Sequence, residues 1–451
     1  MKEFHMKPFD GRPDIHICVP GSKSITNRAL LMAALAEGTS VLRGILFSDD
    51  SRVFIEALQA IGYEISVDEE RAEAVIHGCG RKIPKDKVSV YVGSAGTAAR
   101  FLTAMLALSG GEYELASSEQ MKARPMRPLL EALEQMGVLF EYKEKPYSFP
   151  FRILGRNVQK KNICSGDHEA GALQRVYLNI DESSQFLSAL LLSGVLCEEG
   201  FIVELTGKRD ARAYVKISMK MMEEFGCHME QAGENEYHIL PGQSYQGREY
   251  QIEPDMSAAC YFYAMAAVNG GTALVEHVHF DSTQGDIRFL RVLEKMGCRL
   301  EDTKEGICLT SPETKELQGV DVVMSDFSDQ TMTLAAVSVF AEGKTTIRGV
   351  GHIRKQESDR IHAIVTELRR LGIGCEERED GLVIHPGPMK SSFQAPVMIH
   401  TYEDHRMAMA FAVVGTRQEG IVICDPLCCR KTYEGYFQVL TNLGLRLQLE
   451  E

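Results

Sequence analysis

The segment FLRVLEKMGCRL, residues 289–300, carries the pattern that decides the fold of this chain. Its apolar residues recur at the spacing of one helix face as far as Gly297, and a short run typical of a strand follows. The pattern returns at intervals of roughly 70 to 90 residues, in segments 55–65, 129–140, 218–229, 364–376 and 436–447. A repeat of this length indicates a folding unit that cannot bury its apolar faces alone. The six units must therefore pack against one another.

Another helix, rich in small apolar residues, precedes each of these segments. The six copies begin at Ser24, Ser94, Ser183, Ser257, Asp329 and Asp404. We expect each copy to open with a polar cap and to close at a Gly before a strand. Since apolar positions occur on nearly all sides of these helices, we expect them to be buried, with sheets outside them. Their N-termini would gather on one face of each domain and attract anions.

Length and composition limit the classes of protein that fit. A chain of 451 residues exceeds one ordinary hydrophobic core, so we expect two domains of three units each, with a boundary in residues 241–255. No apolar run reaches the roughly 20 residues of a membrane span, and no apolar secretory stretch opens the chain. We therefore expect a cytoplasmic protein that has no membrane partner. The net charge of −14 argues against a nucleic-acid partner.

The 12 cysteines are scattered along the chain, which favours reduced thiols. Only Cys424, Cys428 and Cys429 crowd together, and no second pair stands at metal-ligand spacing. We therefore expect no metal site. In a chain of this net charge, local clusters of Lys and Arg are informative, because each needs a local reason.

The first such cluster is GSKSITNR, residues 21–28, just before the first buried helix. It lacks the first Gly of a Walker A loop. Lys23 and Arg28 flank the helix start, where an anion would meet backbone N–H groups, Ser hydroxyls and two cations. The alternative is a capped helix start with two solvated cations.

A similar loop, GSAGTAAR, spans residues 93–100 and offers Gly96 for close backbone approach. Nearby, Pro125 favours extended backbone at Arg124, and Arg suits bidentate binding of phosphate or carboxylate. A simple tight turn is the alternative for the Gly-rich loop.

The third and fifth small-residue helices open with polar side chains that suit two roles. Ser183, Ser184 and Gln185 could bind phosphate and hydroxyl groups or cap their helix. Asp326 and Asp329 could also be caps, or one of them could accept a hydroxyl proton in a cationic cleft.

Charged residues crowd together again in GHIRKQESDR, residues 351–360, which alone would be typical of a solvated face. EDHRMAMAF follows and places Arg406 at the start of a buried helix, where a cation opposes the helix dipole. Arg406 therefore needs an anion from the protein or from a ligand. Lys431 lies in the loop before the last helix.

Seven short motifs follow one another over nearly the whole chain: GSKSITNR, GSAGTAAR, RPMRP, SSQFL, QESDR, DHRMAM and RKTYEGYF. In this order and at these spacings they resemble the EPSP synthase family of enolpyruvyl transferases. The resemblance implies two similar α/β domains, each an inside-out arrangement of three βαβαββ repeats, with the substrates between them and closure on binding. We expect the N-terminal domain to span residues 21–252 and the C-terminal domain to combine residues 1–20 with 253–451.

The resemblance also implies a reaction. The 5-hydroxyl of shikimate 3-phosphate adds to the central carbon of phosphoenolpyruvate, and phosphate leaves from a tetrahedral intermediate, as in aromatic amino-acid biosynthesis. No metal or organic cofactor is implied, and we expect a monomer. The catalytic residues implied are Lys23, Asp329 and Glu357. Those implied for phosphoenolpyruvate are Lys23, Gly96, Arg124, Gln185, Arg360, Arg406 and Lys431. Those implied for shikimate 3-phosphate are Lys23, Ser24, Arg28, Ser183, Ser184, Gln185, Tyr214, Asp329 and Gln356.

Charge supports this interpretation. Each phosphate carries roughly −1.5 to −2 near neutral pH, so the two substrates with their carboxylates bring about five to six negative charges. A similar number of cations comes from Lys23, Arg28, Arg124, Arg360, Arg406 and Lys431. We expect these cations to repel one another without ligand and so to favour an open apo state.

The chain departs from the usual pattern of the family at several positions. Gln356 stands where a Lys is usual, so we expect that phosphate contact to be neutral unless Lys355 or Arg354 replaces it. The other departures are His352 for Asn, Ala211 for Ser, Ser94 for Asn and Phe101 for Pro.

Two rival interpretations remain. The related UDP-N-acetylglucosamine carboxyvinyltransferases share the fold and the donor, but they normally carry a Cys in the loop that here reads MKARPMRP. A non-catalytic clamp built from repeats would instead need a basic inner surface for nucleic acid.

Overall fold

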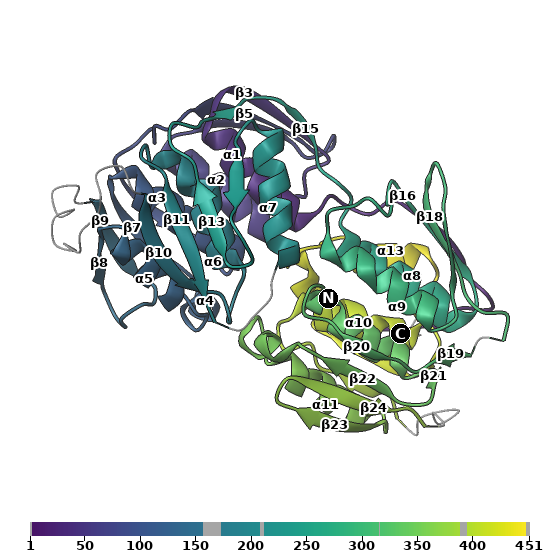
Figure 1. Ribbon diagram of the computed structural model, residues 1–451. Coiled ribbons are helices and arrows are strands. Elements are labelled where there is room, and N and C mark those ends of the chain that lie inside the picture. The colour runs from purple at the N-terminus through teal and green to yellow at the C-terminus, as the bar shows by residue number, and fades with distance from the viewer. Residues whose placement is uncertain (1, 157–172, 208–211, 315, 388–394, 448–451) are drawn as a thin grey trace. The chain divides into compact units, whose positions relative to one another are not determined.

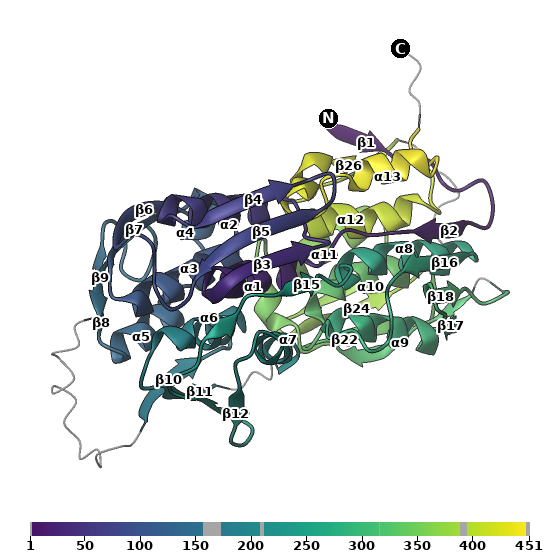
Figure 2. The same cartoon turned by 90° about the horizontal axis from the view of Figure 1, so that it is seen from above.

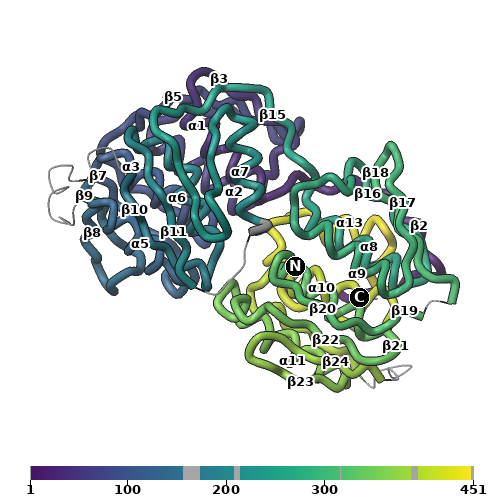
Figure 3. The backbone as a smooth tube through the Cα atoms, in the orientation of Figure 1, coloured from purple at the N-terminus to yellow at the C-terminus, as the bar shows by residue number. Residues whose placement is uncertain are grey.

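The structure is a computed structural model that describes residues 2–156, 173–207, 212–314, 316–387 and 395–447. Backbone contacts divide the chain into two compact units, which can be followed along the tube in Figure 3. The N unit is Lys23–Ile252, and the C unit combines Met1–Ser22 with Glu253–Glu451. Each unit has a hydrophobic core of its own.

The N unit contains three repeats. The first comprises α1 (Lys23–Ala34), β3 (Ala36–Arg43), α2 (Asp49–Ile61), β4 (Glu64–Asp68) and β5 (Glu73–Cys79). The second comprises β6 (Lys87–Tyr91), α3 (Gly96–Ser109), β7 (Glu112–Ala116), α4 (Glu119–Lys122), α5 (Arg127–Gln135), β8 (Val138–Tyr142) and β9 (Phe151–Arg156). The third comprises β10 (Gln174–Asn179), α6 (Gln185–Ser193), β11 (Phe201–Thr206), α7 (Arg212–Glu224), β12 (Met229–Gln231) and β13 (Glu236–Ile239).

The C unit contains three more repeats. The fourth comprises β2 (Asp14–Ile17), α8 (Met256–Asn269), β16 (Thr272–Glu276), α9 (Arg288–Lys295), β17 (Arg299–Asp302) and β18 (Gly306–Thr310). The fifth comprises β20 (Asp321–Val323), α10 (Thr331–Ser338), β22 (Thr345–Arg348), α11 (Arg360–Arg370), β23 (Gly374–Arg378) and β24 (Gly381–His385). The sixth comprises β25 (Val397–Ile399), α12 (His405–Gly415), β26 (Ile421–Cys424) and α13 (Tyr436–Asn442). A small extra sheet pairs β19 (Leu317–Gln318) with β21 (Ala341–Glu342).

One sheet topology recurs. In the second repeat β6 runs parallel to β7, and β9 then pairs antiparallel with both β7 and β8, in the order β6-β7-β9-β8. The sheets β10-β11-β13-β12 and β20-β22-β24-β23 follow the same rule. Strands from distant parts of the chain complete the other sheets. The late strands β14 (Tyr245–Gln246) and β15 (Glu249–Gln251) pair with β3, the early strand β2 pairs with β16, and β1 (Glu3–His5) pairs with β26.

The small-residue helices lie in the interior of each unit with sheets outside them, as the sequence predicts, whereas second helices such as α9 bury one face only (Figures 1 and 2). Nearly every residue of α3, α8 and α12 is buried. The strands alternate between buried and exposed residues, as in β10 and β16. The six glycines after the second helix of each repeat all have positive φ, which L-residues with a Cβ rarely adopt: Gly62, Gly137, Gly226, Gly297, Gly372 and Gly444.

The predicted ends of the small-residue helices are only partly correct. α3 and α8 end at left-handed Gly110 and Gly270, as predicted. However, α1 ends at Ala34, and Gly38 lies within β3 instead of closing the helix. The reason is tertiary, because β3 pairs with β5 from Glu37 to Arg43, and this ladder satisfies backbone groups that a longer helix would have used.

Strand β24 offers a test of the close packing between strands. A Cβ added at Gly381 would lie 2.0 Å from the backbone oxygen of Ile347, whereas one added at Gly387 would meet nothing within 4 Å. We expect Gly381→Ala to lower the free energy of unfolding by about 1–3 kcal/mol, because backbone must move. Gly387→Ala is the matched control. Equal urea midpoints for the two variants would contradict this packing.

Candidate active site

The C unit gathers predicted site residues around Arg360, the first residue of α11, which is 1% exposed. Its Nε lies 2.8 Å from Asp404 Oδ2, its Nη1 lies 3.1 Å from Asp329 Oδ1, and its Nη2 lies 2.9 Å from Glu357 Oε2. Nη1 also donates to the amide oxygen of Gln356. Burial lowers the pKa of Arg360, but the carboxylates of Asp404, Glu357 and Asp329 more than reverse this and raise it. Arg360 is therefore a permanent cation.

The other two predicted cations of this unit also pair with carboxylates. Arg406 Nη2 lies 2.7 Å from Asp329 Oδ2, and Lys431 Nζ lies 3.6 Å from Glu357 Oε1. The anion that Arg406 needs at the head of α12 therefore comes from the protein. The prediction that ligand-free cations repel one another is wrong for this unit, because each faces a carboxylate.

Asp404 was not predicted as a site residue beyond the helix start, although it organises this cluster. Its side chain caps α12 by accepting from Arg406 N at 3.0 Å, and it also accepts from Ser358 Oγ at 3.1 Å. The one available signal was its place before His405 and Arg406 in a motif that precedes a buried helix. Its partner Arg360 stands 44 residues earlier in the chain, which no local pattern reveals.

The turn before Asp404 is strained and tied to α11. Tyr402 and Glu403 both have φ of 56°, a left-handed conformation that costs non-glycine residues roughly 1–2 kcal/mol each. The buried carboxylate of Glu367 holds this turn, since it accepts from Tyr402 Oη at 2.7 Å and from His400 N at 3.2 Å. Burial and then the bond to Glu367 raise the pKa of Tyr402 to about 12, so its hydroxyl stays a donor. Helix α11 thus holds the turn through Glu367, and it holds Asp404 through Arg360.

In the N unit, Lys23 begins α1 and lies 3.6 Å from Asp50 Oδ2, a buried carboxylate near the start of α2. Asp50 was not predicted as part of the site. Ser48 is the N-cap residue of this helix and forms a capping box with Ser51. Lys23, a predicted site residue, is therefore paired with a carboxylate near the start of a neighbouring helix rather than left to solvent.

Arg28 is 2% exposed and is bound by neutral oxygens. Its guanidinium donates to Ser218 Oγ at 2.8 Å, Ser24 O at 2.8 Å, Ser188 Oγ at 3.2 Å and Tyr214 O at 3.2 Å. Within the described residues, no carboxylate lies at ion-pair distance from Arg28. Burial accordingly lowers its pKa to about 10. A buried cation without a counterion is costly, so this position favours an anionic ligand.

Departures from the family pattern lie close to these groups. Phe101 is fully buried, and its ring centroid lies 5.5 Å from the Arg28 guanidinium. A cation over a ring face is attracted to it, so Phe101 supports Arg28. In the C unit, His352 Nε2 lies 2.8 Å from Ser328 Oγ, next to Asp329. Ala211 lies outside the described residues.

Gln185, at the head of α6, is fixed by two neighbours from α3. Its Oε1 accepts from Arg100 Nη1 at 2.5 Å, and its Nε2 donates to Thr97 Oγ1 at 3.2 Å. Arg100 was not predicted as a site residue, although it ends the motif GSAGTAAR. Ser183 and Ser184 lie buried just before α6, and Ser183 Oγ accepts from Gln185 N at 3.2 Å.

Gly96 allows Arg124 to approach the head of α3. A Cβ at Gly96 would lie 2.7 Å from the Arg124 guanidinium, so a side chain at this position would displace that guanidinium from the head of α3. Arg124 Nη1 also donates to Ser94 O at 3.4 Å. Ala95 is the N-cap of α3 and makes no side-chain cap bond. The structure thus brings together two predicted residues and a helix N-terminus.

Gln356 and its neighbours have distinct partners. Gln356 is turned to Arg360, as described above. Arg354 bonds Asp359 at 3.0 Å and Glu377 at 2.8 Å, so it is not free to take the place of the usual Lys. Asp326, the other predicted acid near α10, pairs with Arg288 at the surface rather than with the cluster.

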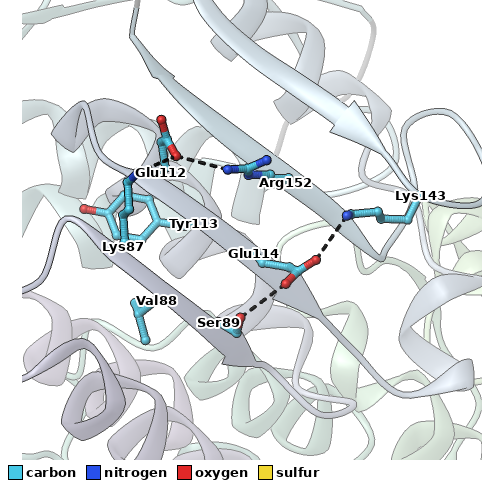
Figure 4. Close-up of a pocket in the computed structure, with 8 residues that line it drawn as sticks. All are labelled: Lys87, Val88, Ser89, Glu112, Tyr113, Glu114, Lys143 and Arg152. Atoms are coloured by element: carbon cyan, nitrogen blue, oxygen red, sulfur yellow. Dashed lines mark hydrogen bonds and ion pairs between the residues drawn. The ribbon is translucent and has the colours of Figure 1, made fainter.

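The hollow in Figure 4 is not part of this site. It lies on the outer face of the sheet β6-β7-β9-β8, where Glu112 pairs with Lys87 and Arg152 and Glu114 pairs with Lys143. No predicted site residue lines it. Within the part of the chain that the structure describes, no helix is long and apolar enough to span a membrane, and no His, Cys, Asp or Glu residues are grouped as metal ligands.

A family model described as EPSP synthase (3-phosphoshikimate 1-carboxyvinyltransferase) matches residues 12–440. This chain belongs to that family. A relative from Nostoc punctiforme named 3-phosphoshikimate 1-carboxyvinyltransferase is 43% identical over 431 residues, which cover 95% of this chain and 96% of the relative. A chloroplastic relative of that name from Arabidopsis thaliana is 39% identical over 442 residues, covering 95% of this chain and 82% of the relative.

Solved structures agree. An EPSP synthase from Acinetobacter baumannii matches with a TM-score of 0.78 and 25% identity, covering all of both chains. The family resemblance and the α/β fold predicted from the motifs are thus confirmed.

The bond between Tyr402 and Glu367 can be tested by Tyr402→Phe. Removing the hydroxyl leaves a buried carboxylate short of one donor, so we expect the free energy of unfolding to fall by about 1–2 kcal/mol. Tyr91→Phe, at a side chain that is 57% exposed, is the control. Urea unfolding followed by circular dichroism measures both. The assignment fails if the two variants have the same midpoint.

Proposed function

We propose that this protein transfers the enolpyruvyl group of phosphoenolpyruvate to the 5-hydroxyl of shikimate 3-phosphate and releases phosphate. The observation that carries the proposal is membership of the EPSP synthase family over residues 12–440, with the family motifs present in order. We further propose that the protein acts as a cytoplasmic monomer without cofactor or metal. Its domains in this proposal are residues 21–252 and residues 1–20 with 253–451.

The C unit supplies the acid–base groups in this proposal. The hydroxyl oxygen attacks the central carbon of phosphoenolpyruvate, Asp329 accepts the hydroxyl proton, and Glu357 donates a proton to the methylene carbon. The ionised Glu357 then takes a proton back from the new methyl group, the carbon–carbon double bond re-forms, and phosphate departs as its bond to the central carbon breaks. Lys23 contacts the phosphate of phosphoenolpyruvate and takes part in proton transfer. Every atom and proton is accounted for without a further reactant.

The ion pairs of the C unit support a particular order of events in this proposal. Arg360 and Arg406 both bond Asp329, which favours its ionised form and makes it a weak base. The carboxylate and phosphate of phosphoenolpyruvate compete with Asp329 for the guanidinium N–H groups of Arg360 and Arg406. Lys431, Arg124 and the backbone at Gly96 also bind phosphoenolpyruvate in this proposal. When the ligand takes over these donors, Asp329 loses counterions and becomes a stronger base. Substrate binding would therefore activate the group that starts the reaction.

The N unit supplies most of the groups proposed for shikimate 3-phosphate. Arg28 is the strongest of them, because it is a buried cation bound by neutral oxygens. The hydroxyls and amide at the head of α6 lie beside an N-terminus that has no side-chain cap. The proposed set combines residues of the N unit with two of the C unit, Asp329 and Gln356. It comprises Lys23, Ser24, Arg28, Ser183, Ser184, Gln185, Tyr214, Asp329 and Gln356.

A phosphate-release assay tests the activity. We expect inorganic phosphate from phosphoenolpyruvate with shikimate 3-phosphate and none with UDP-N-acetylglucosamine. Lys23→Ala should lower kcat by at least about 100-fold, because it removes a group that contacts the reacting phosphate. Lys82→Ala, at an exposed lysine of the same unit, should match wild type. Phosphate release with UDP-N-acetylglucosamine but not with shikimate 3-phosphate would overturn the choice of acceptor. A fully active Lys23→Ala variant would overturn the role of Lys23.

A second experiment tests the anion site at Arg28. We expect Arg28→Ala to raise KM for shikimate 3-phosphate by about 10- to 100-fold, since a hydrogen bond to a charged group contributes roughly 1.5–3 kcal/mol. KM for phosphoenolpyruvate should change less. Arg28→Lys keeps the positive charge but loses the planar guanidinium with its paired donors. Its KM for shikimate 3-phosphate should therefore lie between those of wild type and Arg28→Ala. Arg71→Ala, at an exposed arginine, is the control. If Arg28→Ala weakened only phosphoenolpyruvate, Arg28 would belong to the other substrate.

A further inference from the structure

A buried carboxylate outside the proposed catalytic set lies at the heads of the C-unit helices. Asp286 belongs to the short 3-10 turn Gly285–Ile287 before α9 and is 5% exposed. Its Oδ2 accepts from Ser257 Oγ in the first turn of α8 and from Gln330 Nε2 at 3.3 Å. Its Oδ1 is buried and has no hydrogen-bond partner among the described residues. One oxygen therefore holds two neighbouring side chains, and the other is buried without a hydrogen-bond donor among the described residues.

The bond to Gln330 connects Asp286 with the proposed base. Gln330 follows Asp329 directly in the 3-10 turn Ser328–Gln330, and it is fully buried. Gln330 Oε1 in turn accepts from Thr333 Oγ1 at 2.9 Å, in the first turn of α10. Asp286 and Thr333 therefore hold the Gln330 amide from both ends. This fixes the turn from which the Asp329 side chain reaches Arg360 and Arg406.

The charges around Asp286 come from every element packed against its turn. Asp329 on the neighbouring 3-10 turn and Asp255 at the head of α8 are anionic, and Arg406 at the head of α12 is cationic. Cys260 of α8 donates its thiol to the Asp286 backbone oxygen at 3.7 Å. Arg288, the next residue after the turn, is paired with Asp326 and so does not compensate Asp286. Asp286 and Asp329 therefore share one nearby cation, Arg406.

We propose that Asp286 is a positioning residue for enolpyruvyl transfer: it holds the turn that presents Asp329, and its negative charge increases the basicity of Asp329. This inference rests on the function proposed above. A carboxylate near a second carboxylate makes protonation of both more favourable, because like charges oppose double ionisation. When phosphoenolpyruvate draws Arg406 toward itself, the two acids lose their shared counterion, and the effect of Asp286 on Asp329 grows.

The titration of Asp286 agrees with this geometry. Burial, and then the charge of Asp329, raise the pKa of Asp286 to about 6, against the opposing effects of Arg406 and Ser257. The carboxyl is therefore neutral in mild acid and charged above neutral pH. Its charge is present in the same pH range in which an enzyme of this kind needs a base.

Asp286→Asn tests the proposal because the amide oxygen can still accept from Ser257 and Gln330 while the charge is lost. We expect kcat at pH 8 to fall by about three- to tenfold, and the acid limb of the kcat profile to move to lower pH, because Asp329 becomes a weaker base. KM for both substrates should change less than kcat. Asp321→Asn, at an exposed carboxylate of the same unit that pairs with Arg348, is the matched control.

A variant profile that is only scaled down by one factor at every pH would overturn the proposed effect of the charge. A profile that superimposes on wild type would overturn the whole inference. If wild type itself released no phosphate from phosphoenolpyruvate and shikimate 3-phosphate, the failure would lie with the proposed function.

Thermal unfolding gives a readout that does not depend on activity. Because the folded state raises the pKa of Asp286, this group stabilises the fold only at low pH, and that contribution is lost as pH rises from about 4 to 6. Asn does not titrate. The melting temperature of Asp286→Asn minus that of wild type should therefore increase between pH 4 and pH 7. A difference that stays constant with pH would contradict a buried titrating carboxylate at this position.

Discussion

The C unit depends on how one buried cation is balanced. Arg360 is 1% exposed at the head of α11, and a charge taken so far from water must be paired or it destabilises the fold by several kcal/mol. Its partners come from three separate segments: Asp404 at the head of α12, Asp329 before α10, and Glu357 beside Arg360 itself. Balancing this single charge therefore fixes the relative positions of three helix heads. The same contacts place the groups proposed for proton transfer, so stability and chemistry share one network.

The N unit solves the same problem differently. Arg28 is buried as deeply as most core side chains, but its partners are hydroxyl and carbonyl oxygens and the face of Phe101. A neutral setting lowers the cost of burial only in part, and the lowered pKa of Arg28 reflects what remains. The C unit is thus compensated by its own acids, whereas the N unit keeps a cation that an anionic ligand would complete. This difference suits a reaction in which one substrate is mainly anchored and the other is activated.

The sequence was sufficient for the repeat, the layering and the identity of most charged groups, because these follow from local periodicity and from motifs. Gly62, Gly297 and their four counterparts were predicted from the helix pattern alone, and their positive φ angles are the physical reason for glycine there. The partners of the cations could not be predicted. Arg100 meets Gln185 across 85 residues, and Arg406 meets Asp329 across 77. The predicted helix ends were wrong where strand pairing decided them, as at Ala34.

The N-termini of α8 and α12 in the C unit are capped differently from those of α3 and α6 in the N unit. α8 and α12 are capped by Asp255 and Asp404, whose carboxylates already use the first free N–H groups. α3 begins without a side-chain cap bond from its N-cap residue, so its first N–H groups remain available to an incoming anion. At α6, Ser183 Oγ already accepts from Gln185 N, but the N-cap residue Ser184 makes no cap bond to the following N–H groups. An aspartate at either of these two heads would repel phosphate as well as occupy its donors. The absence of an aspartate cap at α3 and α6, beside Gly96 and Gln185, therefore suits the anion binding proposed for these two residues.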